Sequence, residues 1–148
     1  MLARLPDVFR CLSAHDVRYV VIGGVAAIVH GVPRTTFDVD LLIEATPENA
    51  ARLLAALRDA GIGASELTTP EGVLGHEITV FKDVLRIDVQ TKTPGVDFAT
   101  AWKDRVEREV GGVRYWIVSL DHLLAMKRAA GRPKDLEDVR VLGRGDSG

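Results

Sequence analysis

The apolar run at residues 19–22 constrains the fold more than any other feature, because it ends abruptly in the pair Gly23-Gly24. A short apolar run that does not alternate with polar residues predicts a central strand buried on both faces. The next residues, 25–30, are apolar nearly all round, which predicts a short buried helix closed by Gly31. The chain therefore contains a strand, a glycine turn and a helix, which indicates a domain that packs helices on a sheet.

The other segments alternate between helical and strand patterns. Apolar spacing and end signals predict further helices at residues 5–14, 47–60, 98–108, 119–130 and 133–142, and further strands at residues 37–43, 77–81, 85–91, 109–110 and 113–118. Two pairs of these strands are typical of hairpins, with turns at Lys82-Asp83 and Gly111-Gly112. We predict one α+β domain over residues 1–142, with a mixed, partly antiparallel sheet and helices mainly on one face. Residues 143–148 are predicted to form a flexible tail.

Length and composition limit the class of protein. The chain has 148 residues, enough to bury a core in one domain. Its formal net charge of −2 gives no overall basic field for nucleic acid. The single cysteine, Cys11, excludes an internal disulfide and agrees with a reducing compartment. Residues 1–10 carry three charged side chains, unlike a secretory signal, and no apolar run is long enough to span a bilayer. We expect a cytoplasmic protein without membrane contact.

Two aspartates lie on the strand predicted after the buried helix. Asp38 and Asp40 are separated by a single valine. Because alternate residues of a strand point to the same face, both carboxylates face the same way. At about 3.3 Å per residue they start roughly 6–7 Å apart, so they can lean towards a common cation.

A third aspartate, Asp88, shows the same pattern and shares a strand face with Arg86 and Gln90. Acidic residues are disfavoured inside strands, and two charges about 6 Å apart repel by roughly 2–3 kcal/mol at an effective dielectric of 20. A divalent cation removes this repulsion, and ligands that are all oxygen suit Mg²⁺ or Mn²⁺. The alternative is a solvated strand face on which the acids pair with Arg34 or Arg86.

The pair Gly23-Gly24 lies where the buried strand turns into the helix. Without side chains the backbone can approach a ligand closely, and the N–H groups at the start of a helix favour phosphate. A glycine pair alone marks only a tight turn. Together with Asp38 and Asp40 it predicts one site, in which metal bridges the carboxylates to phosphates at the helix start.

These residues resemble the DNA polymerase β-like nucleotidyltransferase superfamily. The family pattern is an apolar residue, Gly, then Gly or Ser, and nine to thirteen residues later Asp-x-Asp between apolar neighbours. Here thirteen residues separate Gly24 from Asp38, and Asp88 matches an acidic residue on a later strand of the family. The resemblance implies a nucleotidyltransferase-like fold and a bound nucleoside triphosphate. It also implies catalytic metal ions at Asp38, Asp40 and Asp88.

A second resemblance extends into the C-terminal part of the chain. The chain is similar there to small prokaryotic nucleotidyltransferases, both the minimal type and the toxins of abortive-infection systems, through Arg34, Thr36, Asp38, Lys127, Asp135 and Asp138. In the toxin relatives, a lysine on one helix and an Asp-x-x-Asp on the next contribute to the active site. This chain lacks the large helical extension of the full-length toxins.

Each of these further candidates has a second interpretation. Lys127 falls on the inward face of its helix, where it either contacts phosphate or extends past the edge of the core. Asp135 and Asp138 either belong to the site or interact with the helix dipole. Arg34 either clamps phosphate or pairs with a carboxylate beside it. We predict that Gly23, Gly24, Arg34 and Lys127 position phosphates, with Thr36, Asp135 and Asp138 as additional site candidates.

The sequence therefore predicts a metal-dependent nucleotidyltransferase. It would move a nucleoside monophosphate from a triphosphate such as ATP to an acceptor hydroxyl and release pyrophosphate. A tRNA end, a protein side chain and a small molecule all remain open as acceptor. The protein could also act with a partner protein or as a homo-oligomer, for example as part of a toxin–antitoxin or two-component system. The alternative function is a non-catalytic nucleotide-binding or antitoxin-type module with the same fold.

Overall fold

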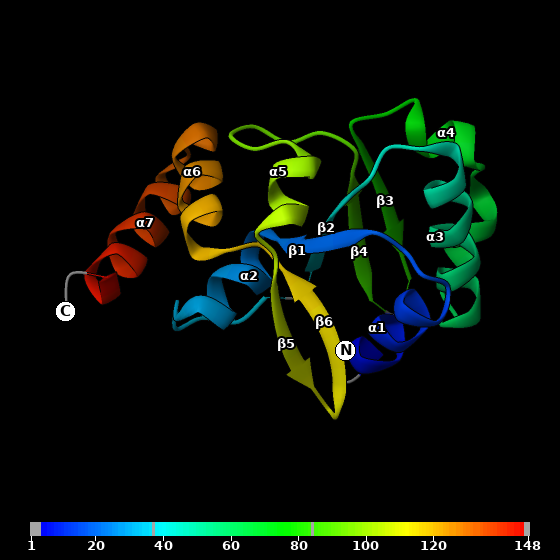
Figure 1. The fold of residues 1–148 in the computed structure, drawn as a ribbon, viewed down its shortest axis with the longest axis horizontal. Coiled ribbons are helices and arrows are strands. Elements are labelled where there is room, and N and C mark those ends of the chain that lie inside the picture. Colours follow the sequence, from blue (N-terminus) through cyan, green and yellow to red (C-terminus); the bar gives the residue numbers. More distant parts are fainter. Residues whose placement is uncertain (1–3, 37, 84, 147–148) are drawn as a thin grey trace.

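The computed structural model describes residues 4–36, 38–83 and 85–146, which form a single six-stranded sheet with helices around it (Figure 1). The strands are β1 (Tyr19–Ile22), β2 (Asp38–Ile43), β3 (Ile78–Lys82), β4 (Arg86–Gln90), β5 (Val106–Val110) and β6 (Val113–Ile117). The helices are α1 (Leu5–Ala14), α2 (Gly23–His30), α3 (Pro47–Asp59), α4 (Pro70–Leu74), α5 (Phe98–Lys103), α6 (Leu120–Ala130) and α7 (Pro133–Asp146), with a 3₁₀ turn, η2, at Gly63–Leu67.

The sheet is mixed, as predicted. The strand order is β3-β4-β2-β1-β6-β5. Strand β1 runs antiparallel to β2 and parallel to β6, and β2 runs parallel to β4. The two outer strands, β3 and β5, pair antiparallel with their neighbours as the predicted hairpins. All four residues of β1 are buried, which confirms the central strand inferred from residues 19–22.

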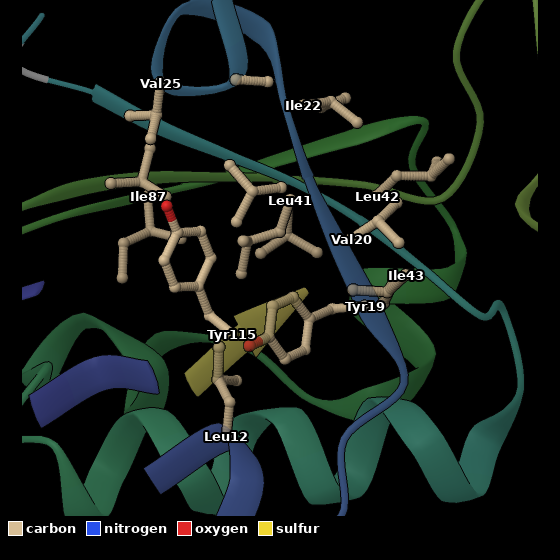
Figure 2. Packing of buried hydrophobic residues seen from close by; sticks show 14 of the residues in the cluster. Leu12, Tyr19, Val20, Ile22, Val25, Leu41, Leu42, Ile43, Ile87 and Tyr115 are labelled. Carbon is tan, nitrogen blue, oxygen red and sulfur yellow. The ribbon is translucent and has the colours of Figure 1, made fainter. Parts of the chain in front are cut away.

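One face of the sheet carries the aromatic part of the core. Phe9 of α1 stacks on Tyr19 of β1 and on Tyr115 of β6, with ring centroids 6.2 and 4.4 Å apart. Figure 2 shows Tyr19 and Tyr115 between the strands and the helix that carries Leu12. Helices α1 and α3 pack together, and Figure 1 shows them on the same side of the sheet. The opposite face of β2 carries Asp38 and Asp40, which are half-buried, and Leu42, which is buried.

Helix α6 has the ends that the sequence predicts. The Ser119 side chain accepts a hydrogen bond from the His122 backbone N–H at 3.2 Å, and Gly131 closes the helix with φ +67°. Such caps fix both ends of a helix. Helices α6 and α7 pack on each other and contact α2, so the C-terminal part of the chain lies beside the end of the central strand (Figure 1).

The helix predicted at residues 98–108 is wrong in its second half. Helix α5 ends at Lys103, and residues 106–110 form β5, which pairs along its length with β6. The hairpin turn at Gly111-Gly112 has φ of +55° and +79° and brings β5 next to β6. The hydrogen bonds between the two strands then outweigh the local helix propensity of residues 106–108. The short elements η2 and α4 were not predicted, because each is only five residues long.

The C-terminal helix is longer than predicted. Helix α7 extends to Asp146, so residues 143–146, expected to belong to a flexible tail, are helical. Residues 147–148 and Phe37, the predicted first residue of the strand at 37–43, lie outside the described residues. Among the described residues, no helix combines the length and the apolar character needed to cross a bilayer.

A loop between β4 and α5 lies against α6 at Gly95. A Cβ atom on Gly95 would come within 2.8 Å of the Ala125 carbonyl oxygen and 2.9 Å of the Met126 Cα. Gly95 also has φ +95°, a conformation that disfavours other residues. The close backbone contact therefore requires glycine at this position.

We expect Gly95→Ala to lower the melting temperature by more than the backbone conformation alone explains. Positive φ costs a residue with a Cβ about 1–2 kcal/mol. Gly112→Ala is the matched control, because Gly112 has φ +79° and nothing within 4 Å of its added Cβ. Thermal melts of the two variants measure the difference. Equal losses would contradict the contact between the loop and α6.

Candidate active site

Three aspartates from neighbouring strands line one cavity of about 530 Å³. In the parallel pair of β2 and β4, Asp40 lies opposite Asp88, and Asp38 lies opposite Arg86. Partners in register point to the same face of a sheet, so the strand parity inferred from the sequence brings Asp38, Asp40 and Asp88 to one wall. This face is the one opposite the stacked Phe9 and Tyr19.

Asp40 lies closest to the glycine turn. A Cβ atom on Gly23 would come within 2.3 Å of Asp40 Oδ2, so the missing side chain makes room for this carboxylate. Burial, and then the charges of Asp88 and Asp38, raise the pKa of Asp40 to about 6, although a hydrogen bond from the Gly24 backbone N–H works in the other direction. The Gly24 N–H at the start of α2 was expected to bind phosphate. In this structure it donates a hydrogen bond to the Asp40 carboxylate instead.

Arg86 is the cation that the acids share in this structure. Its Nε atom lies 2.9 Å from Asp88 Oδ1 and 4.0 Å from Asp38 Oδ2. A second contact joins Arg86 Nη2 to Asp88 Oδ2 at 3.3 Å. The ion pair with Arg86, one of the two interpretations of the acidic strands, is therefore present. The Arg86 side chain is 43% exposed, which makes this pairing a weak one.

The carboxylate oxygens of the three aspartates are suitable ligands for a divalent cation, but their positions in this structure do not form a complete metal site. No group of three His, Cys, Asp or Glu side chains in the described ranges is arranged to hold a metal ion as it stands. The reason is visible at Asp88, whose two oxygens both contact Arg86. The donor set is nevertheless all oxygen. Burial raises the pKa of Asp40 most, and the charges of Asp88 and Asp38 raise it further, so a divalent cation such as Mg²⁺ or Mn²⁺ would relieve this site.

A second wall of the cavity carries positive charge. Arg34, Lys127, Arg132 and Lys134 all contribute to the lining. Arg34 forms a bidentate pair with Asp138, at 3.0 and 2.8 Å, although the two residues are 104 positions apart. The alternative interpretation of Arg34, a pair with a carboxylate, is thus present in the structure, but the partner belongs to α7 instead of the neighbouring strand.

Lys127, Asp135 and Asp138 form a buried ion cluster. Their exposed fractions are 6%, 1% and 2%. Lys127 Nζ lies 2.9 Å from Asp138 Oδ2 and 3.5 Å from Asp135 Oδ1. Burial acts to raise the pKa of Asp135, but Arg132 and then Lys127 hold it below its ordinary value. The helix dipole alone does not explain the two aspartates, because both bind cations from other segments.

The remaining predicted residues lie at the same place. Thr36 lines the cavity, and a Cβ on Gly24 would contact its hydroxyl at 3.3 Å. Asp138 lies beneath the cavity, bonded to two residues of its wall. Arg132 was not predicted, although it pairs with Asp135 at 2.6 Å. Its position three residues before Asp135 at the start of a helix was the available signal.

Comparisons with known proteins concern the fold and the family of this chain. A solved structure from Thermotoga maritima, described as a "putative nucleotidyltransferase", is similar over 94% of this chain and 89% of its own, with a TM-score of 0.60. The sequence identity is 18%, so this likeness concerns the fold. A search of curated proteins gives no match. The family model described as "Nucleotidyltransferase of unknown function (DUF6036)" matches residues 2–143. The chain belongs to this family of nucleotidyltransferases.

Proposed function

We propose that this protein transfers a nucleoside monophosphate from a metal-bound nucleoside triphosphate to an acceptor hydroxyl and releases pyrophosphate. The observation that supports the proposal is the cavity itself, which has Asp38, Asp40 and Asp88 on one wall and cationic side chains on another. Carboxylates attract a divalent cation, while arginine and lysine attract phosphate oxygens. A cavity with both kinds of charge suits a triphosphate that carries a metal ion.

The three aspartates have distinct parts in this proposal. Asp38, Asp40 and Asp88 would hold Mg²⁺ or Mn²⁺, which supplies charge neutralisation to the phosphates and to the attacking and leaving oxygens. The Asp88 carboxylate takes the proton of the acceptor hydroxyl as the hydroxyl oxygen bonds to the α-phosphorus. The bond between that phosphorus and the pyrophosphate oxygen then breaks, and pyrophosphate leaves.

The phosphates are positioned by the glycine turn and by the cationic wall. Gly23 makes room for the Asp40 carboxylate next to the glycine turn, and Thr36 offers a hydroxyl next to Gly24. Lys127 is held in place by two buried carboxylates and lines the cavity, so its ammonium group is oriented before a ligand arrives. Arg34 is oriented in the same way by Asp138.

Arg86 must release Asp88 before all three aspartates can bind metal. The exchange requires little energy, because a surface ion pair contributes only about 0–1 kcal/mol. The Arg86 guanidinium remains in the lining of the cavity, where it can pair with a phosphate after Asp88 has turned to the metal. Arg86 thus offsets part of the negative charge of the acids until a charged ligand arrives.

Incubation with α-labelled nucleoside triphosphates, Mg²⁺ and cell extract tests the transfer. We expect label to enter one class of molecule, whether RNA, protein or small metabolite. Because Asp38 and Asp40 are proposed to hold the metal, replacing both with asparagine should reduce labelling by about 100-fold or more. The labelled class identifies the acceptor.

The matched control for the double replacement is Asp121→Asn, which changes an exposed aspartate of α6 away from the cavity. Its labelling should equal that of the wild type. Nucleotide binding without any transfer would contradict the proposed reaction and would favour the non-catalytic nucleotide-binding module.

A further inference from the structure

A second cavity, of about 510 Å³, adjoins the first one. Thr93 lines both cavities. The floor of the second cavity is Leu42, which lies two residues after Asp40 on β2 and therefore on the same face of the sheet. Its register partner, Gln90, lines the first cavity. The two cavities thus follow one another along β2 and β4.

The two cavities differ in chemistry. The first is surrounded by charged side chains, whereas the second includes the apolar side chains Leu42, Val96 and Phe98 together with the loop backbone at Gly95. The close contact of Gly95 with α6 fixes the loop that forms this wall. A ligand that extends across both cavities would therefore have one highly charged end and one end with apolar surfaces.

Phe98 is the aromatic side chain that lines the second cavity. Its ring stacks on Trp102, with centroids 5.7 Å apart and planes at 22°. Since Phe98 is half-buried and lines the cavity, the exposed part of its side chain can be reached by a ligand there. Stacking of a base on an aromatic side chain is favourable and tolerates any base.

We propose that the second cavity binds the nucleoside part of the triphosphate, with the base against Phe98. The inference rests on the proposed function, which places the phosphates in the first cavity. The order of the subsites follows from the strands. The triphosphate extends from Asp40 towards the glycine turn, and Leu42 lies on the other side of Asp40 along β2, at about 6–7 Å for two residues. A pocket of about 510 Å³ also lies in the range used by small ligands.

The acceptor is expected to approach from another direction. Asp88, which takes the proton of the acceptor hydroxyl, lies opposite Val80 of β3, whose exposed side chain lies on this edge of the sheet. The second cavity is lined by Leu42 and by residues that follow the C-terminal end of β4. The nucleoside and the acceptor are thus assigned to different surfaces.

Isothermal titration of Mg²⁺-ATP and of Mg²⁺-tripolyphosphate tests the assignment. In the wild type we expect ATP to bind about 10-fold more tightly than tripolyphosphate, because only ATP reaches Phe98. In Phe98→Leu, which keeps an apolar side chain, ATP affinity should fall by about 10-fold while tripolyphosphate affinity stays unchanged. Phe98→Tyr keeps the ring and should retain ATP affinity.

The outcomes separate this inference from the proposed function. If neither ligand binds the wild type, the proposed function fails and the inference falls with it. If both ligands bind the wild type equally, the proposed function stands and the nucleoside assignment is overturned, even if Phe98→Leu does not fold. If Phe98→Leu loses affinity for both ligands by the same factor, Phe98 only maintains the structure of the phosphate site and does not contact the base. This result would also overturn the assignment.

Discussion

Asp40→Asn is expected to stabilise the protein, by about 2–3 kcal/mol at pH 7 without metal. The pKa of Asp40 is raised from 3.8 to about 6, so the folded protein disfavours the ionised form. Each step of one pK in such a shift corresponds to about 1.4 kcal/mol. Asparagine removes the charge but keeps an oxygen that can accept the Gly24 N–H. For a chain of this length, the gain corresponds to a melting temperature higher by roughly 5–10 °C.

The effect has a defined pH dependence. Because the folded pKa of Asp40 is higher than its unfolded value of 3.8, the folded protein binds more protons between pH 4 and pH 6. The wild type therefore loses stability as the pH rises through this window, and the cost is fully present above pH 6. Thermal melts of wild type and Asp40→Asn should differ most at pH 7–8 and converge towards pH 4.

Two comparisons make the Asp40 result specific. Asp121→Asn, an exposed change on α6, should show no such pH-dependent gain. Mg²⁺ and ATP at about 100 times the dissociation constant should stabilise the wild type by roughly 2.7 kcal/mol and should not stabilise Asp40→Asn. An Asp40→Asn variant that melts earlier than the wild type at pH 7 would mean that attraction to Arg86 outweighs the repulsion among the acids.

Lys127→Met is expected to have an effect of similar size and opposite sign. Methionine keeps the apolar stem, but the buried carboxylates of Asp135 and Asp138 lose the ammonium group that lies between them. Removing one partner of a buried ion pair typically costs about 3–5 kcal/mol. Since Arg34 and Arg132 remain as partners, we expect a loss near 3 kcal/mol, or a melting temperature lower by roughly 6–12 °C.

Lys134→Met is the matched control for Lys127→Met. The chemical change is the same, but Lys134 is exposed at the first turn of α7. Its melting temperature should stay within about 2 °C of the wild type, because exposed substitutions are usually within ±0.5 kcal/mol. Equal melting temperatures for the two variants would contradict a stabilising role of the buried cluster.

The parts of the fold that depend on local pattern could be predicted from the sequence. The alternation of residues 38–43 and 86–90 placed the three aspartates on the correct face, because side-chain parity is a local property. The apolar stripe of α6 likewise placed Lys127 on the inward face. The ends of that helix followed from Ser119 and Gly131.

The parts that depend on distant partners could not be predicted. Nothing in the sequence near Arg34 indicates that its partner is Asp138, because the two segments meet only when α7 packs beside α2. Residues 106–108, which were predicted as part of a helix, belong to a strand because of the hairpin with β6. The space beside Gly23 is filled by Asp40 of another strand, a contact visible only once β1 and β2 are paired.

The strand order has a consequence for the synthesis of the chain on the ribosome. Strand β1 can pair with β2 soon after residue 43 has emerged, but its other edge pairs with β6, which ends at Ile117. At about 5–20 residues per second, the edge stays open for roughly 4–15 seconds. An open edge of four apolar residues is a template on which another chain can add a strand. Aggregation of this protein should therefore arise mainly during translation, and slower elongation before residue 117 should increase it.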